Sequence, residues 1–171
     1  MQILLLLAPI GLPLLAAAGI AAAGWRPVTA AAGLLAVLLM LTDAVALATA
    51  VLRTGPVTAL DGLVRADALS VWMLLVMAAV ATLACWASPG YLRDATTVPW
   101  AARWYGILLY LFIAAMTTAV LAGNLGVLWV AVEATTIVTA FLVGHHRSRT
   151  ALEAAWKYVV ICSAAIAIAF L

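Results

Sequence analysis

The sequence predicts an all-α integral membrane protein with about six transmembrane helices. Of its 171 residues, 69% are apolar and only 8% are charged, and the mean hydropathy is +1.27. A soluble domain is nearer half apolar and a quarter charged. The apolar residues also gather into runs of about 20, the length that crosses a bilayer as a helix. Most of the ionisable residues fall between these runs, as a multi-pass protein requires.

Each predicted helix corresponds to one apolar run. Pro9 and Pro13 are expected to kink the first helix, and the last run is still apolar at Leu171, without a cap or a glycine stop. This ending predicts that residues 1–171 form a single transmembrane domain that is the incomplete N-terminal portion of a longer protein. The predicted spans cover residues 3–24, 28–52, 68–88, 104–121, 125–144 and 151–171.

Two of the connecting segments are long enough to form structure of their own. Residues 53–67 contain the turn pairs Gly55-Pro56 and Asp61-Gly62 around a short β-like stretch, which predicts a small hairpin on the membrane surface. Asp67 directly precedes the third apolar run and is expected to be its N-cap. Residues 88–104 mix prolines with charges and favour a surface loop or a short interfacial helix.

The basic residues predict the orientation of the chain. Consecutive connections alternate between the two membrane faces, and arginines are concentrated on the cytoplasmic face of membrane proteins. One face collects five arginines against two on the other, so the N-terminus is expected outside. The five are Arg26, Arg93, Arg103, Arg147 and Arg149, and the two are Arg53 and Arg65.

Composition and motifs argue against several classes of function. A net charge of +2 is too small to indicate nucleic acid as a partner. Cys85 and Cys162 lie far apart inside apolar runs, so they indicate neither a metal site nor a disulfide framework. His145 and His146 are adjacent in the basic turn 145–149 and do not by themselves complete a metal site. No cofactor fingerprint is present, and no cofactor is expected.

Glu133 is the first candidate for a functional residue. It lies near the middle of the fifth apolar run, roughly 12 Å from the outer helix end at about 1.5 Å per residue. A carboxylate at this depth is costly, and such residues commonly serve as proton relays. Thr136, one turn away on the same helix face, is a candidate to hold a water or share the proton. The alternative is a structural glutamate that bonds a neighbouring helix.

Lys157 and Asp43 are the other ionisable residues inside predicted helices. Glu153 precedes Lys157 by four residues, the favourable order for a helical ion pair. Lys157 therefore has two interpretations, a proton-translocating residue or an anchor that extends to the membrane interface. Asp43 lies well inside the second run and is either a second proton site or an acceptor for a hydrogen bond from another helix.

Two stretches resemble a known family. The run LWVAVEATTIVTAFLVG, the basic turn and ALEAAWKYVVICS are similar to the fifth and sixth helices of antiporter-like membrane subunits. This family includes the ion-pumping subunits of respiratory complex I, Mrp-type antiporters and the membrane subunits of [NiFe] hydrogenases. The segments EATT and LEAAWKY are most similar to the sequence of hydrogenase-4 component F. RADALSVWMLLVM also resembles the family's entry into its third helix, so the resemblance covers about residues 67–163.

The resemblance implies roles for individual residues. Glu133 matches the intramembrane glutamate of the family's fifth helix, and Lys157 matches the lysine of its sixth. The family pairs that glutamate with a lysine on a seventh helix, and it also contains broken helices further along. This chain ends before them. The resemblance therefore implies an N-terminal fragment, a split-gene product or a degenerate copy, located in the bacterial plasma membrane.

Three functions follow as hypotheses. The first is the N-terminal part of a proton-translocating subunit in a hydrogenase or NADH:quinone oxidoreductase-like complex, with no redox chemistry of its own. The second is part of an Mrp-type cation/proton antiporter, and the third is a structural membrane segment without transport. The expected partners are the lipid bilayer, other membrane subunits of such an assembly and the missing C-terminal half. The similarity of the EATT and LEAAWKY segments to the family favours the first hypothesis.

Overall fold

The computed structural model describes residues 2–95, 99–144 and 149–170, and most of these residues are helical. Within these described ranges, six helices are long and apolar enough to cross a membrane, which confirms the predicted fold class. A small antiparallel hairpin of β1 and β2, with the 3-10 turn η1 between the strands, joins the second helix to the third. The elements are α1 (Gln2–Ala23), α2 (Pro27–Thr54), β1 (Val57–Ala59), η1 (Leu60–Gly62), β2 (Val64–Ala66), α3 (Ala68–Ala95), α4 (Pro99–Val120), α5 (Leu125–Val143) and α6 (Arg149–Phe170).

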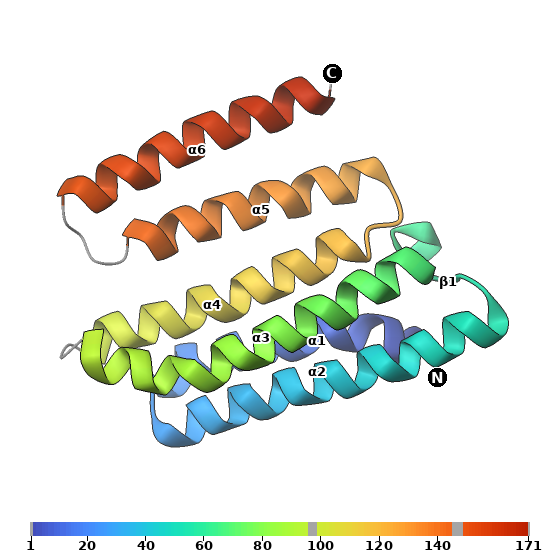
Figure 1. Cartoon of the computed structure of the whole chain (residues 1–171), viewed down its shortest axis with the longest axis horizontal. Coiled ribbons are helices and arrows are strands. Elements are labelled where there is room, and N and C mark those ends of the chain that lie inside the picture. The colour runs from blue at the N-terminus through green and yellow to red at the C-terminus, as the bar shows by residue number, and fades with distance from the viewer. Residues whose placement is uncertain (1, 96–98, 145–148, 171) are drawn as a thin grey trace.

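The helices form a four-helix unit with two further helices stacked on one side (Figure 1). Helices α1 to α4 pack against one another, α5 packs on α4, and α6 packs on α5. Most of the buried residues belong to the first four helices and the hairpin. On α6 only Ala155 is buried among the residues whose exposure the structure describes. The α5 and α6 helices therefore present most of their surface to whatever surrounds the chain.

Small residues let the first four helices approach closely. A Cβ atom on Gly33 of α2 would lie 2.1 Å from the Tyr110 hydroxyl oxygen of α4, and one on Gly106 would lie 2.5 Å from the Trp25 ring. Lipid tails are as apolar as leucine, so helices in a bilayer associate through close packing rather than through apolar burial alone. The two glycines thus make room for the aromatic side chains that hold α1, α2 and α4 together.

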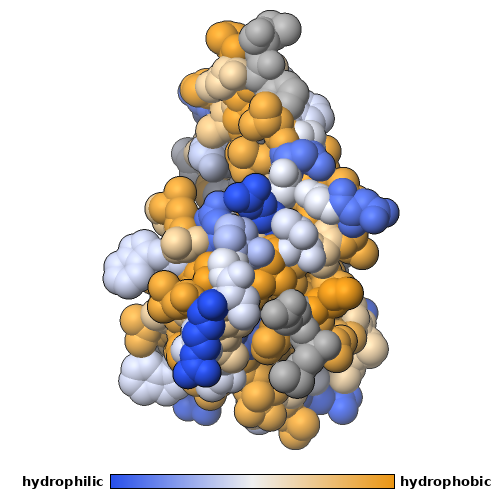
Figure 2. All heavy atoms as spheres, turned by 90° about the vertical axis from the view of Figure 1, so that its right-hand side faces the viewer, coloured by the Kyte–Doolittle hydropathy of each residue, from blue (hydrophilic) through white to orange (hydrophobic). Residues whose placement is uncertain are grey.

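The predicted hairpin is confirmed, and it packs on the turn between α4 and α5. Val57 pairs with Ala66 at the open end of the hairpin. The Arg65 amide donates to the Leu121 carbonyl at 2.8 Å, and the Gly123 amide donates to the Leu63 carbonyl at the same distance. Figure 2 looks onto this end of the molecule and shows hydrophilic residues gathered across its middle. The hairpin therefore fixes where α5 begins.

The cap at Asp67 is also as predicted. Its carboxylate accepts a hydrogen bond from the Ser70 amide at 2.9 Å and from the Ser70 hydroxyl at 3.1 Å, at the first turn of α3. The amide bond is the main reason why the pKa of Asp67 lies below its ordinary value of 3.8. An acidic N-cap satisfies an otherwise unpaired amide and complements the positive end of the helix.

The connection between α3 and α4 differs from the prediction. Helix α3 continues past Pro89 to Ala95, and α4 already begins at Pro99, so most of residues 88–104 are helical. Proline in a helix interior removes one backbone hydrogen bond and is normally disruptive. Here Tyr91 and Tyr105 rings pack with centroids 5.5 Å apart, which joins the two extended ends. Pro99 is at the first helical position, where its fixed φ is favourable.

Candidate functional site

The capped start of α5 sets the depth of Glu133. The Asn124 side chain accepts a hydrogen bond of 2.9 Å from the Val127 amide, an N-cap that defines the first turn. Glu133 is the ninth residue of a helix that runs from Leu125 to Val143. At about 1.5 Å per residue it lies roughly 12 Å beyond the helix start, and the sequence expectation of a mid-helix carboxylate holds.

Glu133 is linked to α6 by a short hydrogen bond. The Ser163 hydroxyl donates to Oε1 of Glu133 at 2.5 Å, across 30 residues of sequence. Glu133 and Ser163 are both half-buried. A hydroxyl donor to a carboxylate is a charge-assisted bond, and such bonds are shorter and stronger than bonds between neutral groups. Among the described residues, this bond is the polar contact between the Glu133 side chain and helix α6.

Thr136 takes a different partner from the one considered in the sequence. Its hydroxyl donates to the Val132 carbonyl at 3.2 Å, and the neighbouring Thr135 hydroxyl donates to the same carbonyl at 2.7 Å. Both are bonds to a preceding turn of their own helix, a common arrangement for threonine inside helices. The Thr136 proton is therefore committed to the backbone, and no bond from it to Glu133 is described.

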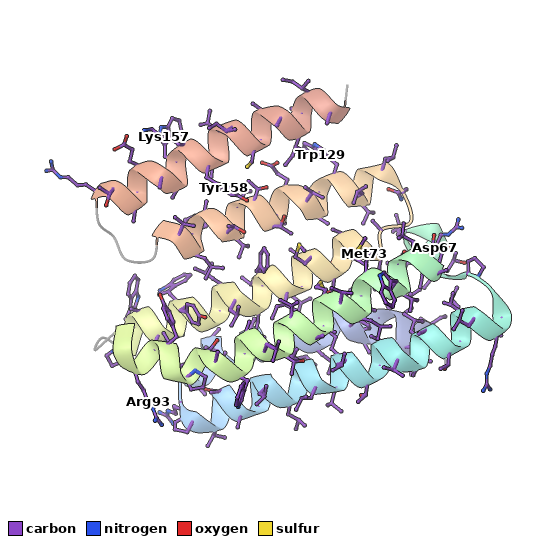
Figure 3. All side chains as sticks on the ribbon, viewed as in Figure 1. Asp67, Met73, Arg93, Trp129, Lys157 and Tyr158 are labelled. Atoms are coloured by element: carbon purple, nitrogen blue, oxygen red, sulfur yellow. The ribbon has the colours of Figure 1, made fainter. Side chains whose placement is uncertain are left out.

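Lys157 lies away from Glu133. Its ammonium is 2.5 Å from the Glu153 carboxylate, and the two side chains are 63% and 62% exposed. Figure 3 shows Lys157 on the side of α6 that points away from α5, whereas Tyr158 points toward α5. Lys157 and Ser163 are six residues apart, and at about 3.6 residues per turn this spacing places them on different faces. The structure does not bring the two site residues predicted from sequence together.

Sequence reasoning missed the serine that bonds Glu133. Ser163 is a hydroxyl in an apolar run, and nothing in its local pattern distinguishes it from a serine that bonds its own helix. Tyr158, on the same helix, interacts with Thr139 of α5 and with Cys162. The interface between α5 and α6 therefore contains several polar groups, and their shared position is a property of the packing.

The remaining candidate site residues lie partly inside and partly outside the ranges that the structure describes. His145, His146, Arg147 and Ser148 of the basic turn lie outside the described residues, and Arg149 begins α6. In the described part of the chain, no group of three or more metal-ligating side chains is close enough to hold a metal ion. Asp43 lies in α2 with its Oδ2 atom buried and without a hydrogen-bond partner. Cys85 and Cys162 are free thiols.

The fold and the intramembrane carboxylate define a multi-pass membrane protein. No family model matches the chain. A curated protein, "Hydrogenase-4 component F homolog" from Methylacidiphilum infernorum (isolate V4), is 34% identical over 67 residues. This similarity confirms the resemblance to the antiporter-like membrane subunits. The match covers 39% of this chain and 14% of the relative, so the chain spans only a small part of the relative's length.

Proposed function

We propose that this chain is the N-terminal part of a proton-translocating membrane subunit, in which Glu133 is a proton site. The observation that carries the proposal is the hydrogen bond of 2.5 Å from Ser163 to Glu133. It joins a carboxylate in the middle of one spanning helix to a hydroxyl on the next. Intramembrane carboxylates with a named polar partner are the usual components of proton relays.

The surroundings of Glu133 support this role. The carboxylate is half-buried rather than enclosed, so part of it faces away from the six helices, where a further partner of the proton relay has room to reach it. The Ser163 hydroxyl donates to it now and also has acceptor lone pairs, which allows the same group to take part in either direction of proton transfer. Lys157 is a further candidate for translocation, because it matches the family's lysine. Its ion pair with Glu153 instead favours an anchoring role.

The proposed setting is a redox complex of the hydrogenase or NADH:quinone oxidoreductase type in the bacterial plasma membrane, with the N-terminus outside. The similarity to a protein named as a hydrogenase-4 component F homologue supports this setting. In it, electron transfer takes place in other subunits, and this chain contributes no cofactor. The exposed surfaces of α5 and α6 would then face the rest of the subunit, including the lysine partner that the family pairs with its glutamate.

The test is Glu133→Gln in the assembled parent complex. Glutamine keeps the shape and the capacity to accept the Ser163 hydrogen bond but removes the titratable charge. We expect proton uptake into vesicles to fall sharply while a native gel shows normal assembly. The matched control is Asp61→Asn, which removes an exposed carboxylate in η1, outside the spanning helices, and should leave proton uptake almost unchanged. Full proton uptake by an assembled Glu133→Gln complex would make Glu133 a structural residue.

Measurements in the same vesicles distinguish the hypothesis of a redox-complex subunit from that of an antiporter subunit. Proton movement that follows electron flow through the complex supports the first hypothesis. Proton movement that requires a sodium gradient and no electron donor supports the Mrp-type alternative. A complex that assembles and moves neither ion would support the third hypothesis, a structural segment.

A further inference from the structure

An open groove lies at the end of the α1–α4 unit where α1 turns into α2. It is bounded by this turn, the first two turns of α2, the last turns of α3 and the first turn of α4, and its volume is about 670 Å³. Ligand pockets in proteins commonly have volumes of about 300–1,000 Å³. Among the described residues, none from α5 or α6 lines the groove, so it is separate from Glu133 and Ser163.

The inner wall of the groove is apolar and held in place by packing. Cys85 and Leu92 of α3 line it and are only 4% and 5% exposed. Trp25, from the turn, also lines it, and its ring packs edge-on against Tyr105 with centroids 6.3 Å apart. The same ring lies against Gly106, where a Cβ atom would come within 2.5 Å of it. The groove is therefore preformed, and an apolar chain binds in it without reordering these side chains.

The groove extends from the helix ends toward the middle of the bundle. At its outer end, Pro27 is the first residue of α2, and Arg93 lies in the last turn of α3. From there the lining residues continue to Leu34 and Cys85, about 10–12 Å further along the helices at about 1.5 Å per residue. Tryptophan gathers at the headgroup level of a membrane, and Trp86 lines the groove with 71% of its surface exposed. A bound molecule therefore has one end among the lipid headgroups and the other among the acyl chains.

The segments that bound the groove carry an excess of positive charge. They contain three arginines and one aspartate, Asp94, which is a net charge of +2. The Arg103 guanidinium donates to the Ala21 carbonyl, whereas Arg93 lines the groove and is exposed. Figure 3 shows Arg93 at the end of the bundle where α2 begins, and the exposed Arg26 lies between two lining residues. The bounding segments are residues 24–34, 85–95 and 99–106.

We propose that this groove binds one anionic phospholipid, with the lipid phosphate at Arg93 and an acyl chain along the apolar wall. The planar guanidinium matches a phosphate with paired hydrogen bonds, and basic pockets between spanning helices bind anionic headgroups. The apolar wall requires a molecule with a hydrocarbon chain, and the charge at the outer end requires that its head be negative. The site does not rest on the function proposed for Glu133, because its test measures lipid binding and not transport.

The experiment is the thermal stability of the full chain in detergent, measured with phosphatidylglycerol, phosphatidylcholine or inorganic phosphate added. A ligand that binds the folded state raises its Tm. At about 100 times its Kd, phosphatidylglycerol should raise the Tm by roughly 5–10 °C, and neither of the other two additions should match it. An equal rise with phosphatidylcholine would overturn the anionic headgroup, and an equal rise with phosphate alone would overturn the lipid. No rise with phosphatidylglycerol would overturn the site.

Arg93→Gln tests the headgroup contact. The variant should reduce the Tm rise with phosphatidylglycerol to the level seen with phosphatidylcholine. Arg93→Lys should keep part of the rise, because lysine retains the charge but not the paired hydrogen bonds. The matched control is Arg53→Gln, at an exposed arginine in the last turn of α2, far from the groove, and it should keep the full rise. A full rise in Arg93→Gln would show that the phosphate does not bind at Arg93.

Ala31→Phe tests the groove itself. Ala31 lines the groove and is exposed, so a phenylalanine ring there occupies part of the groove without disturbing buried packing. The Tm rise with phosphatidylglycerol should be largely lost, whereas Ala79→Phe, at an exposed alanine of α3 outside the groove, should keep it. The Tm of each variant without lipid checks that its fold is preserved. A wild-type response in Ala31→Phe would place the lipid elsewhere and refute the proposal.

Discussion

The hydroxyl of Ser163 and the carboxylate of Glu133 join α6 to α5 at 2.5 Å, between residues 30 positions apart in the sequence. The contact has two consequences. It provides the half-buried carboxylate with a donor, and it is one of the polar contacts between α5 and α6, together with that of Tyr158 and Thr139. A hydrogen bond to a charged group contributes about 1.5–3 kcal/mol, twice a neutral one or more.

Replacing Ser163 with alanine should weaken both the site and the packing of α6. The variant leaves Glu133 without its described donor, so we expect lower proton uptake in the parent complex and a stability loss of about 1.5–3 kcal/mol. Ser163→Thr keeps the hydroxyl and is the matched control. Proton uptake in vesicles and Tm in detergent measure the two effects. Normal values of both in Ser163→Ala would contradict the importance of this bond.

Replacing Lys157 with alanine should have a smaller effect than Glu133→Gln. The Lys157–Glu153 pair is exposed, and helical ion pairs of this type contribute about 0.3–0.5 kcal/mol. We therefore expect a small loss of stability and a partial loss of proton uptake. A double-mutant cycle with Glu153→Ala measures the coupling between the two side chains. A loss of uptake as large as that of Glu133→Gln would make Lys157 a translocating residue of equal importance.

The orientation of the chain is tested by labelling single cysteines from outside the cell. In a background without Cys85 and Cys162, Thr58→Cys in β1 should react with an impermeant maleimide, because its side chain is exposed at the hairpin end. Ser148→Cys, in the basic turn, should react only after the membrane is permeabilised. The physical reason is the excess of arginine on the cytoplasmic side. Labelling of position 148 and not of 58 in intact cells would reverse the orientation.

The cap at Asp67 should make the protein less stable as the pH falls into the acidic range. Because hydrogen bonding to Ser70 lowers its pKa in the folded state, its contribution is present above the ordinary value of 3.8. The contribution is lost as the pH falls through that value toward the folded pKa. Asp67→Ala should cost about 1 kcal/mol near neutral pH, and Asp67→Ser should recover most of it. Tm measured at several pH values tests this, and a wild type minus Asp67→Ala difference that does not fall in acid would contradict it.

The sequence by itself determined the elements that depend on local chemistry. Hydropathy over about 20 residues identified the six spans, and the turn pairs Gly55-Pro56 and Asp61-Gly62 identified the hairpin. Asp67 was identifiable as a cap from its place before an apolar run. The mid-helix depth of Glu133 follows from counting residues. Each of these features is set by neighbours in the chain, so one sequence was sufficient to predict it.

The tertiary structure decided which side chains meet. An apolar membrane helix has no strong hydrophobic stripe, so its sequence does not reveal which face packs against which neighbour. For this reason the serine partner of Glu133, the outward direction of Lys157 and the unpartnered oxygen of Asp43 could not be read from their own segments. The continuation of α3 past Pro89 has the same origin, because packing between Tyr91 and Tyr105 outweighs a local signal for ending the helix.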